Sequence, residues 1–310
     1  MTILKVDRIS KAFHKDGVTV HAIRDVSLNV DAGEVLAFLG PNGAGKTTAI
    51  KMMAGLIYPD SGGVLIEGES PANHSVLRKV GAVLEGNRNL YWRLTVKENL
   101  EYFGVLRGMP FDKTAQRATE LIECFGLGDK TNSIALHLSR GMQQKLSIAV
   151  ALMHDPKLLL LDEPTLALDV QAVEDMIALI RTISKEGKAI LITTHQLDIA
   201  QKVATRVAMI QSGRVMVEDT PTNLISAYSS GIYSIYLDQP IPTDVSHQLR
   251  ALGAELYGET VIVKTGVSAL YACLEHLKPI PIQRIERDSA DLEYIFREVT
   301  KTNHESSTSR

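Results

Sequence analysis

Gly40-Pro41-Asn42-Gly43-Ala44-Gly45-Lys46-Thr47-Thr48 is the stretch that decides the fold. It matches the pattern Gly-x-x-x-x-Gly-Lys-Ser/Thr, follows the apolar run 35–39, which predicts a buried strand, and precedes 49–53, which predict a helix. A strand, a glycine-rich turn and a helix in this order are the context in which the pattern holds nucleotide phosphates. Because this context occurs together with the Lys-Thr pair, we set aside a glycine-rich turn without chemistry.

The residue types in this loop suit the phosphates of a nucleotide. Backbone N–H groups reach the β- and γ-phosphates only where no Cβ intervenes, which explains the three glycines. The helix that follows points its positive N-terminal end at the same anion. Lys46 can then lie between the terminal phosphates while the Thr47 hydroxyl binds Mg²⁺, and Thr48 is expected beside the nucleotide rather than on the metal. The sequence therefore predicts a site for ATP and Mg²⁺.

Composition sets limits on the class of protein. With 310 residues and 45% hydrophobic content, the chain can bury a large core, and its length suggests one large and one small domain. The formal net charge is −3, and no cluster of lysine and arginine stands out in the sequence. We therefore expect no nucleic-acid partner.

Cysteine usage and hydropathy give two further expectations. Cys124 and Cys273 are far apart without metal-ligand spacing, so we expect two reduced thiols that act in packing rather than a disulfide framework or a zinc site. Residues 1–7 lack the apolar core of a signal peptide, and no run approaches the ~18 apolar residues of a membrane span. Any role at a membrane would therefore depend on a partner.

Residues 2–35 show short alternating apolar patterns separated by turn-forming residues, which predict an antiparallel β layer. Phe13 is expected in the first loop of this layer, and by itself it fits ordinary core packing as well as a functional contact. Short strands follow the phosphate loop at 63–68 and 80–84. From Tyr91 to Met153 the pattern is helical and carries no strand signal. We interpret this segment as a helical insertion between two halves of a sheet.

Leu138-Ser139-Arg140-Gly141-Met142-Gln143 stands at the start of the last helix of this insertion. Ser139 is a typical N-cap residue, and Gly141 allows a close backbone approach at the positive end of the helix. By themselves these residues indicate only the beginning of a helix.

Two adjacent carboxylates follow a strand that is apolar throughout. Leu158 to Leu161 predict a fully buried strand, which leads into Asp162 and Glu163. Such a pair at the carboxyl end of a central strand is costly unless a cation faces it. We expect Asp162 to hold Mg²⁺ through the coordination shell of the ion. We expect Glu163 to polarise the water that attacks the γ-phosphate. A solvated acidic pair is the weaker alternative, because the same chain contains the phosphate loop.

A further polar group is expected at the same edge of the sheet. The apolar residues of 173–183 recur at helical spacing, and the strand 189–192 then leads to Thr193-Thr194-His195. A histidine after a strand is more often structural, but the carboxyl edge of an open α/β sheet is where ligands bind. A closing hairpin at 207–217 follows, and the first domain is predicted to end near Ile225.

Together, these motifs resemble the ATP-binding subunit of an ABC transporter over residues 1 to about 225. The resemblance assigns Gly40 to Thr48 to the Walker A loop, Leu138 to Gln143 to the signature motif, Leu158 to Glu163 to the Walker B strand, Leu166-Ala167-Leu168-Asp169 to the D-loop and His195 to the switch histidine. It implies an α/β fold of the P-loop NTPase type, an ABC ATPase core with a mixed sheet, an antiparallel β layer and a helical subdomain at about 91–153. It also implies that Phe13 stacks on adenine and that His195 contacts the γ-phosphate.

The resemblance also implies partners. In this family the residues matched by Ser139 and Gly141 bind the γ-phosphate held by the opposite subunit, and Asp169 of the D-loop is counted with the nucleotide-binding residues. One phosphate loop and one signature per chain imply a head-to-tail dimer of ATPase subunits, for which a homodimer is our expectation. The form Leu-Ser-Arg-Gly-Met is similar to that of export systems with ABC-2 type membrane subunits. We therefore expect an exporter ATPase at the cytoplasmic face of the membrane, bound through transmembrane permease subunits.

Residues 231–300 are predicted to form a separate accessory domain. Their pattern is strand, helix, strand, strand, helix, strand, which predicts a small α+β fold. Asp291 to Phe296 resemble the ending of the accessory domain of drug-export ATPases. The segment carries no phosphate or metal constellation, so we expect a role in regulation or dimer contact. The tail 301–310 is predicted to be disordered.

Glu85 departs from the family pattern, because most relatives place a glutamine after the strand at 80–84. In the family that glutamine ligates Mg²⁺, and glutamate has the same reach and is a harder oxygen donor. We therefore expect Glu85 to be a metal ligand. The alternative is that its side chain turns away to solvent.

Two other functions are weighed against transport. A soluble ABC ATPase that acts on ribosomes or DNA would usually carry tandem cassettes, coiled-coil insertions or zinc cysteines, and none is visible in the sequence. A nucleotide-binding regulator without turnover conflicts with an intact Glu163. We therefore interpret the chain as an ATPase that drives export.

Overall fold

The phosphate loop follows a strand that is buried along its whole length. This strand, β3 (Val35–Leu39), belongs to a six-stranded sheet with the order β5-β6-β7-β3-β8-β9. The strands from β5 through β8 run parallel, and β9 is antiparallel to β8. The computed structural model describes residues 1–310 except 16, 86–88, 229, 230, 232, 264–266, 288–290, 298 and 300–310.

The other strands of this sheet come from segments far apart in the sequence. They are β5 (Val80–Val83), β6 (Leu158–Asp162), β7 (Ala189–Thr194), β8 (Arg206–Gln211) and β9 (Arg214–Asp219). β3, β6 and β7 are buried at every position, as expected of strands covered on both faces. Because parallel strands end at one edge of a sheet, the residues that follow these three strands gather at that edge.

A second, three-stranded antiparallel sheet forms the β layer predicted from residues 2–35. Its order is β2-β1-β4, made by β1 (Thr2–Lys15), β2 (Val18–Asp31) and β4 (Ser61–Ile66). The sequence suggested several short strands, whereas the structure has two long ones with register shifts, near which Arg8 and Asp25 adopt φ of 46° and 55°. Bulges absorb the breaks in apolar alternation without ending the strands. Phe13 consequently lies within β1 and not in a loop.

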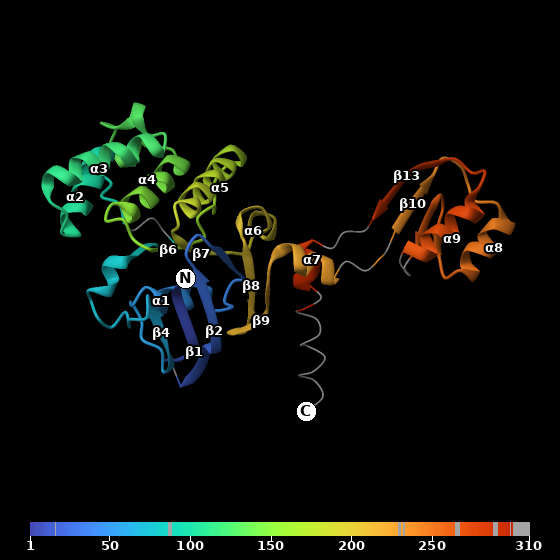
Figure 1. Cartoon of the computed structure of the whole chain (residues 1–310), viewed down its shortest axis with the longest axis horizontal. Helices are drawn as coiled ribbons and strands as arrows, with labels where there is room; N and C mark the ends of the chain where they lie inside the picture. Colours follow the sequence, from blue (N-terminus) through green and yellow to red (C-terminus); the bar gives the residue numbers. More distant parts are fainter. Residues whose placement is uncertain are drawn as a thin grey trace. The chain divides into compact units, whose positions relative to one another are not determined.

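Helices make up the insertion and connect the strands. The insertion contains α2 (Val96–Leu106), α3 (Phe111–Cys124) and α4 (Arg140–Leu152), which lie together in Figure 1, and α4 also contacts β5 of the six-stranded sheet. The connecting helices are α1 (Lys46–Met53), α5 (Val170–Lys185) and α6 (Leu197–Val203). Short 3-10 turns occur at Val76–Lys79, Gly128–Lys130 and Ala135–His137. One buried apolar cluster joins both sheets and α1, which fixes the phosphate loop between them.

The contacts divide the chain into two units, Met1–Thr220 and Pro221–Arg310. The second unit contains α7 (Pro221–Tyr228), β10 (Tyr233–Leu237), α8 (Thr243–Ala251), β11 (Glu255–Tyr257), β12 (Thr260–Val263), α9 (Val267–Leu277) and β13 (Ile282–Arg287). The boundary at Thr220 places α7 in the second unit, whereas the sequence placed the end of the first domain near Ile225. The tail 301–310, which the sequence predicts to be disordered, lies outside the described residues.

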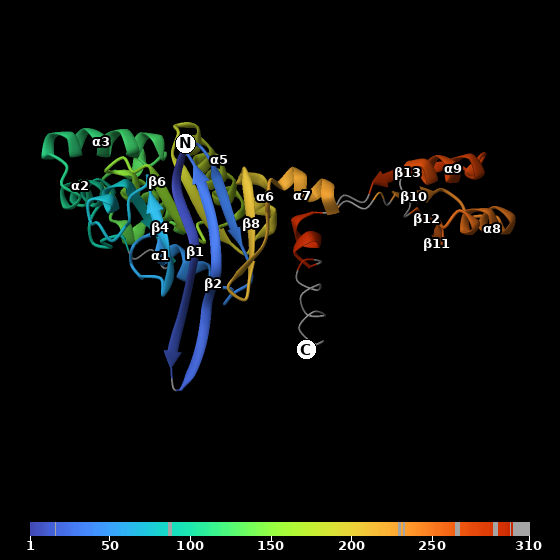
Figure 2. The ribbon, with the colours of Figure 1, turned by 60° about the horizontal axis from the view of Figure 1, so that its bottom comes forward.

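The second unit has its own sheet and its own apolar core. Its four strands are antiparallel and have the order β11-β12-β10-β13, and α8 and α9 complete the β-α-β-β-α-β order of a ferredoxin-like fold. Buried side chains such as Ile235, Val261 and Cys273 form its core. Residues 292–297 are helical and lie beside α7 in both views (Figures 1 and 2).

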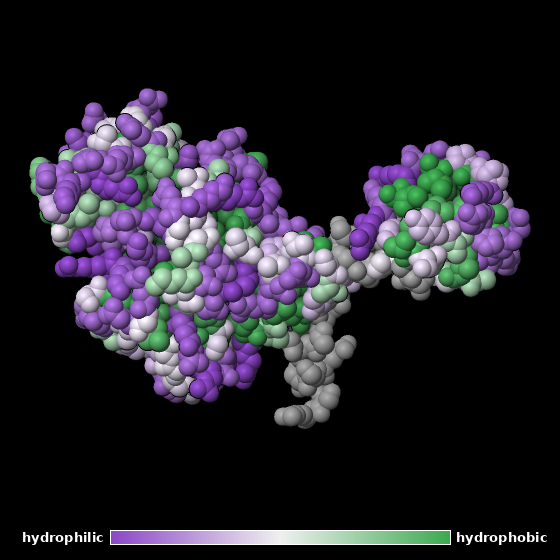
Figure 3. Space-filling model, in the orientation of Figure 1, coloured by the Kyte–Doolittle hydropathy of each residue, from purple (hydrophilic) through white to green (hydrophobic). Residues whose placement is uncertain are grey.

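The helices, the surface and the two cysteines of the described chain bear on the expectations drawn from hydropathy and cysteine usage. In the part of the chain that the structure describes, no helix is long and apolar enough to cross a bilayer. In the view of Figure 3, hydrophilic side chains cover most of the surface of the first unit. Cys124 and Cys273 are both free thiols; Cys273 is buried in packing as predicted, whereas Cys124 is exposed, so the predicted packing role is wrong for Cys124.

Candidate nucleotide site

A cavity of about 520 Å³ opens at the carboxyl edge of the six-stranded sheet. The phosphate loop lines it together with Glu85, Glu163 and His195. These residues follow β3, β5, β6 and β7, four strands of one sheet. The parallel sheet therefore brings together polar groups that are distant in sequence. They lie at its carboxyl edge, where ligands of open α/β sheets bind.

The glycines of the loop are required by close contacts and by conformation. Gly45 has φ of 109°, and a Cβ there would lie 2.4 Å from the carbonyl oxygen of Ala22. A Cβ on Gly40 would lie 2.4 Å from the carbonyl oxygen of Ile210. Gly43 has φ of 80°, and no atom lies within 4 Å of where its Cβ would be. The loop is thus fixed by its neighbours at Gly40 and Gly45 and open beside Gly43, which suits the close approach of an anion.

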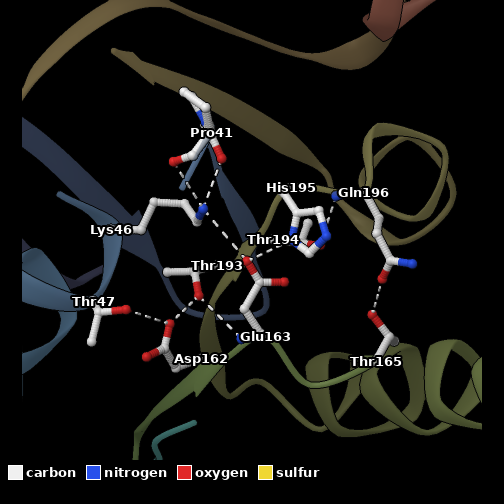
Figure 4. A network of polar contacts seen from close by, with 11 residues as sticks. Pro41, Lys46, Thr47, Asp162, Glu163, Thr165, Thr193, Thr194, His195 and Gln196 are labelled. Carbon is white, nitrogen blue, oxygen red and sulfur yellow. Dashed lines mark hydrogen bonds and ion pairs between the residues drawn. The ribbon is translucent and has the colours of Figure 1, made fainter. Parts of the chain in front are cut away.

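Lys46 is buried and turned onto its own loop. Its Nζ donates a hydrogen bond to the Gly40 carbonyl at 2.7 Å and lies 3.4 Å from the Pro41 carbonyl oxygen (Figure 4). Its Nζ also lies 3.5 Å from Glu163 Oε1, and the Lys46 side chain is only 7% exposed. A buried ammonium held by carbonyls at the N-terminus of α1 is a ready partner for a phosphate.

Asp162 is held by hydroxyl groups on two sides. Thr193 Oγ1 and Thr47 Oγ1 both donate to Asp162 Oδ1, the latter at 3.4 Å (Figure 4). Asp162 is buried, and its Oδ2 has no partner among the described residues. An orphaned buried carboxylate oxygen is costly unless a cation faces it. With the Thr47 hydroxyl beside it, Asp162 offers the hard oxygen ligands that Mg²⁺ prefers, so the residues present fit this metal.

Glu163 lies between two cationic or potentially cationic groups. Its Oε1 is 3.0 Å from His195 Nδ1 and 3.5 Å from Lys46 Nζ, and its buried Oε2 has no partner within the described part of the chain. The backbone of Glu163 has φ of 50°, and its N–H donates to both the carbonyl and the hydroxyl oxygen of Thr193 at 3.1 Å. A positive φ costs a residue with a side chain about 1–3 kcal/mol and occurs mainly where surrounding contacts impose it. These contacts hold the carboxylate toward the phosphate loop.

Leu166 of the predicted D-loop lines this cavity, whereas Ser139 and Gly141 of the signature and Asp169 of the D-loop do not. Ser139 caps α4 by accepting a hydrogen bond from Met142 N at 3.3 Å, and Asp169 caps α5 by accepting one from Ala172 N at 2.8 Å. A Cβ on Gly141 would lie 2.9 Å from the Cβ of Ala172, so the first turns of the two helices are in contact. Ser139, Gly141 and Asp169 therefore lie at the N-terminal ends of two neighbouring helices and do not line the cavity of their own chain.

Phe13 and Glu85 lie at the margin of the site. Phe13 is 41% exposed on β1 and pairs with Val20 of β2, and it is Val20 that lines the cavity. Lys11 Nζ lies 5.7 Å from the centre of the Phe13 ring. Glu85 is exposed and lines both this cavity and an adjoining one of about 320 Å³, which Asp162 and Glu163 also line. Glu85 therefore lies near both carboxylates, and its metal ligation stays a prediction.

Sequence reasoning missed the contribution of the β layer to the cavity. His21, Ala22 and Arg24 of β2 line it together with Val20, and so does Ser212 in the turn between β8 and β9. No local signal could have found them, because β2 belongs to the other sheet and meets the phosphate loop only in the folded chain. The sequence analysis also assigns no role to Thr193, although a hydroxyl side chain at the end of an apolar strand indicates a polar contact there.

A phosphate loop between a buried strand and a helix, with two carboxylates at the end of a neighbouring strand, defines a nucleotide-hydrolysing protein of the P-loop class. Residues 23–166 match the model of the family described as ABC transporter. The chain is 39% identical over 211 residues to the ABC transporter ATP-binding protein NatA of Bacillus subtilis (strain 168), an alignment that covers 67% of this chain and 85% of that protein. The chain belongs to the family of ABC transporter ATP-binding subunits and is an ABC-type ATPase.

Two further relatives transport in opposite directions, by their names. The Nod factor export ATP-binding protein I of Burkholderia lata is 39% identical over 245 residues, which are 77% of this chain and 79% of that protein. The methionine import ATP-binding protein MetN of Escherichia coli (strain K12) is 33% identical over 260 residues, which are 80% of this chain and 76% of that protein. The family is thus established, and the direction of transport is a separate question.

A solved structure confirms the predicted fold. A dimeric ATP-binding cassette in a post-hydrolysis state, bound to ADP and Pi, is similar with a TM-score of 0.64 and 27% sequence identity. The match covers 70% of this chain and 98% of that cassette. The mixed sheet, the antiparallel β layer and the helical insertion are therefore those of an ABC ATPase.

Proposed function

We propose that this chain is the ATP-hydrolysing subunit of an ABC-2 type exporter, bound to transmembrane permease subunits at the cytoplasmic face of the membrane. The observation that carries the direction of transport is its 39% identity to the Nod factor export protein over 245 residues, against 33% to the methionine import protein over 260. The Leu-Ser-Arg-Gly-Met signature at 138–142 and the ending 291–296 support the same group through their resemblance to export ATPases.

In the proposed reaction, the phosphate loop binds and orients ATP. Backbone N–H groups around Gly43 and the N-terminus of α1 face the phosphates, and Lys46 exchanges its carbonyl partners for the β- and γ-phosphate oxygens. Val20 and Ala22 line the same cavity and offer an apolar wall to the rest of the nucleotide. Phe13 of the neighbouring strand is proposed to stack on adenine.

Glu163 is proposed as the general base. Its carboxylate accepts a proton from a water molecule whose oxygen attacks the γ-phosphorus, while the bond to the β,γ-bridging oxygen breaks and ADP leaves. His195, hydrogen-bonded to Glu163 at 3.0 Å, orients the carboxylate and contacts the γ-phosphate. Thr193 fixes both neighbouring acids, since its hydroxyl donates to Asp162 and accepts from the Glu163 N–H.

Thr47, Asp162 and Glu85 are proposed to hold Mg²⁺. When bound, this ion neutralises charge on the phosphate oxygens. Ser139, Gly141 and Asp169 lie outside the cavity of their own chain, so we propose that they act on the nucleotide of a second subunit in a head-to-tail dimer, expected to be a homodimer. That a similar solved cassette is dimeric supports the association of two such subunits.

Purification from the native host tests the proposal. A tagged chain should co-purify with a polytopic membrane protein, and a Lys46→Ala variant should co-purify equally well but without ATPase activity. In inside-out membrane vesicles, ATP added outside should drive a substrate of the co-purified permease into the lumen. Recovery with ribosomes or DNA and without a membrane protein would contradict a transport role, and ATP-driven loss from the lumen would indicate import.

A further inference from the structure

The sheet of the second unit ends in an exposed edge strand. β13 pairs with β10 on one side, and no strand among the described residues pairs with its other side. All six residues of β13 are exposed, whereas the opposite edge strand, β11, has three residues. An edge strand of this length offers a row of backbone N–H and C=O groups to another strand.

The core-facing side of β13 carries Ile285 and, two residues further along, Arg287, which lies opposite the buried Tyr233. Ile285 lies opposite Ile235 of β10, which is fully buried, and Ile235 in turn lies opposite the buried Val261 of β12. Ile285 therefore continues the apolar face of the sheet to its edge, but it is 43% exposed. A strand added to this edge would cover it.

The other face of β13 carries two opposite charges that are held in place. Arg284 lies opposite Tyr236, with its guanidinium carbon 4.3 Å from the centre of the ring. Arg284 Nη1 also lies 3.2 Å from Glu286 Oε1, and both side chains are about half exposed. Successive residues of a strand alternate between faces, so Arg284 and Glu286 share the face that Ile285 does not.

We propose that β13 pairs with β13 of a second copy of this chain, antiparallel about a twofold axis that lies midway between the two copies of Ile285. A twofold axis that relates two antiparallel edge strands is normal to the sheet, so each residue faces a partner residue on the same face. One residue of β13 must therefore face its own copy across the axis, and the charges decide which one.

Among the six described residues of β13, only the register centred on Ile285 pairs opposite charges. There Arg284 faces Glu286 of the partner subunit, Glu286 faces Arg284 of the partner subunit, and Ile285 faces Ile285 of the partner subunit. Centring on Arg284 would oppose two arginines, and centring on Glu286 would oppose two glutamates. Opposite charges directly across a strand pair stabilise it and like charges destabilise it. The sequence Ile-Gln-Arg-Ile-Glu-Arg is thus complementary to itself in a single register.

This contact goes beyond the proposed function, because it is independent of ATP. It would join two four-stranded sheets into one and tether two cassettes at a high effective concentration. The head-to-tail dimer over the nucleotides could then open after hydrolysis without separation of the subunits.

Cysteine cross-linking of the full chain tests the register. Ile285→Cys, in a Cys124→Ser background that removes the exposed native thiol, should form a disulfide-linked dimer under mild oxidation without nucleotide. Residues directly opposite have Cα atoms about 4.5–5.5 Å apart, within disulfide range. The matched control is Ile282→Cys, similarly exposed on the same strand but about 20 Å from its own copy in this register. Equal cross-linking of the two variants, or none of either, would overturn the proposal.

A charge exchange tests the same contact without cysteines. Glu286→Arg should raise the dissociation constant of the nucleotide-free dimer about tenfold or more, because it places arginines opposite each other twice. Adding Arg284→Glu to this variant should restore dimerisation, since the pairs are re-formed with exchanged charges. Sedimentation analysis measures both, with thermal unfolding as the control for folding. An unchanged constant in the single variant, or a folded double variant as weak as the single one, would refute the pairing. If the double variant does not fold, the cysteine experiment decides.

Discussion

Replacing Glu163 with glutamine should separate ATP binding from ATP hydrolysis. Glutamine keeps the size of the side chain and a polar oxygen or nitrogen toward His195 Nδ1, which lies 3.0 Å from Glu163 Oε1. It cannot accept a proton from the attacking water. Loss of a positioned general base slows a reaction about 10²–10⁴-fold, so kcat for ATP should fall by a factor in this range.

The same substitution should tighten ATP binding. Lys46 Nζ and Glu163 Oε1 are 3.5 Å apart, and the two side chains are only 7% and 8% exposed. At an effective dielectric constant of about 20, unit charges at this distance attract each other by about 5 kcal/mol, most of which is offset by their desolvation. The γ-phosphate competes with this carboxylate for Lys46. If about 1 kcal/mol of the attraction becomes available to ATP, its Kd falls about fivefold.

Two assays and one matched control decide the outcome. Phosphate release measures turnover, and titration with a fluorescent ATP analogue measures affinity. Glu174→Gln removes a carboxylate that lies 2.6 Å from Lys202 Nζ, but both partners are about half exposed, so this variant should behave like the parent protein. Turnover of Glu163→Gln within threefold of the parent would refute the role of Glu163 as the base. Loss of ATP binding would refute the competition argument.

Three further predictions follow from single contacts. Gly45→Ala should abolish ATP binding and lower the free energy of unfolding by about 3 kcal/mol or more, whereas Gly63→Ala, which meets no atom within 4 Å, should stay close to the parent in thermal melts and ATP titrations. Glu85→Ala should raise the Mg²⁺ concentration needed for half-maximal turnover and Glu85→Gln should not; equal Mg²⁺ dependence of the alanine variant and the parent would show that the carboxylate is not at the metal. The hydrogen bond from Lys188 holds the pKa of Asp155 below its ordinary value of 3.8, so this pair stabilises the fold above that value and loses its effect as the pH falls through the lowered pKa. Asp155→Asn should therefore reduce the urea midpoint at neutral pH and converge with the parent in acid, and a gap that persists in acid would contradict the assignment.

The sequence by itself determined the class of protein and most of the chemistry of the site. The phosphate loop, the acidic pair Asp162-Glu163 and His195 each follow a short apolar run, and these local patterns were enough to place them at strand ends. They could be predicted because a phosphate-binding turn depends on neighbouring residues and because a buried strand is apolar along its length. The strand and helix order of the second unit was predicted for the same reason.

The tertiary structure alone decided which of these groups meet and what else joins them. The contact of Lys46 with Glu163 and that of Thr193 with Asp162 depend on how β3, β6 and β7 are ordered and aligned, which no single strand encodes. The wall formed by β2 depends on how the two sheets pack. The exposed edge at β13 follows from its place at the end of a sheet, since the same six residues in a central strand would have a neighbour on both sides. Local patterns specify the elements, whereas strand order and layer packing are set by long-range burial of apolar surface, which joins residues that are far apart in the sequence.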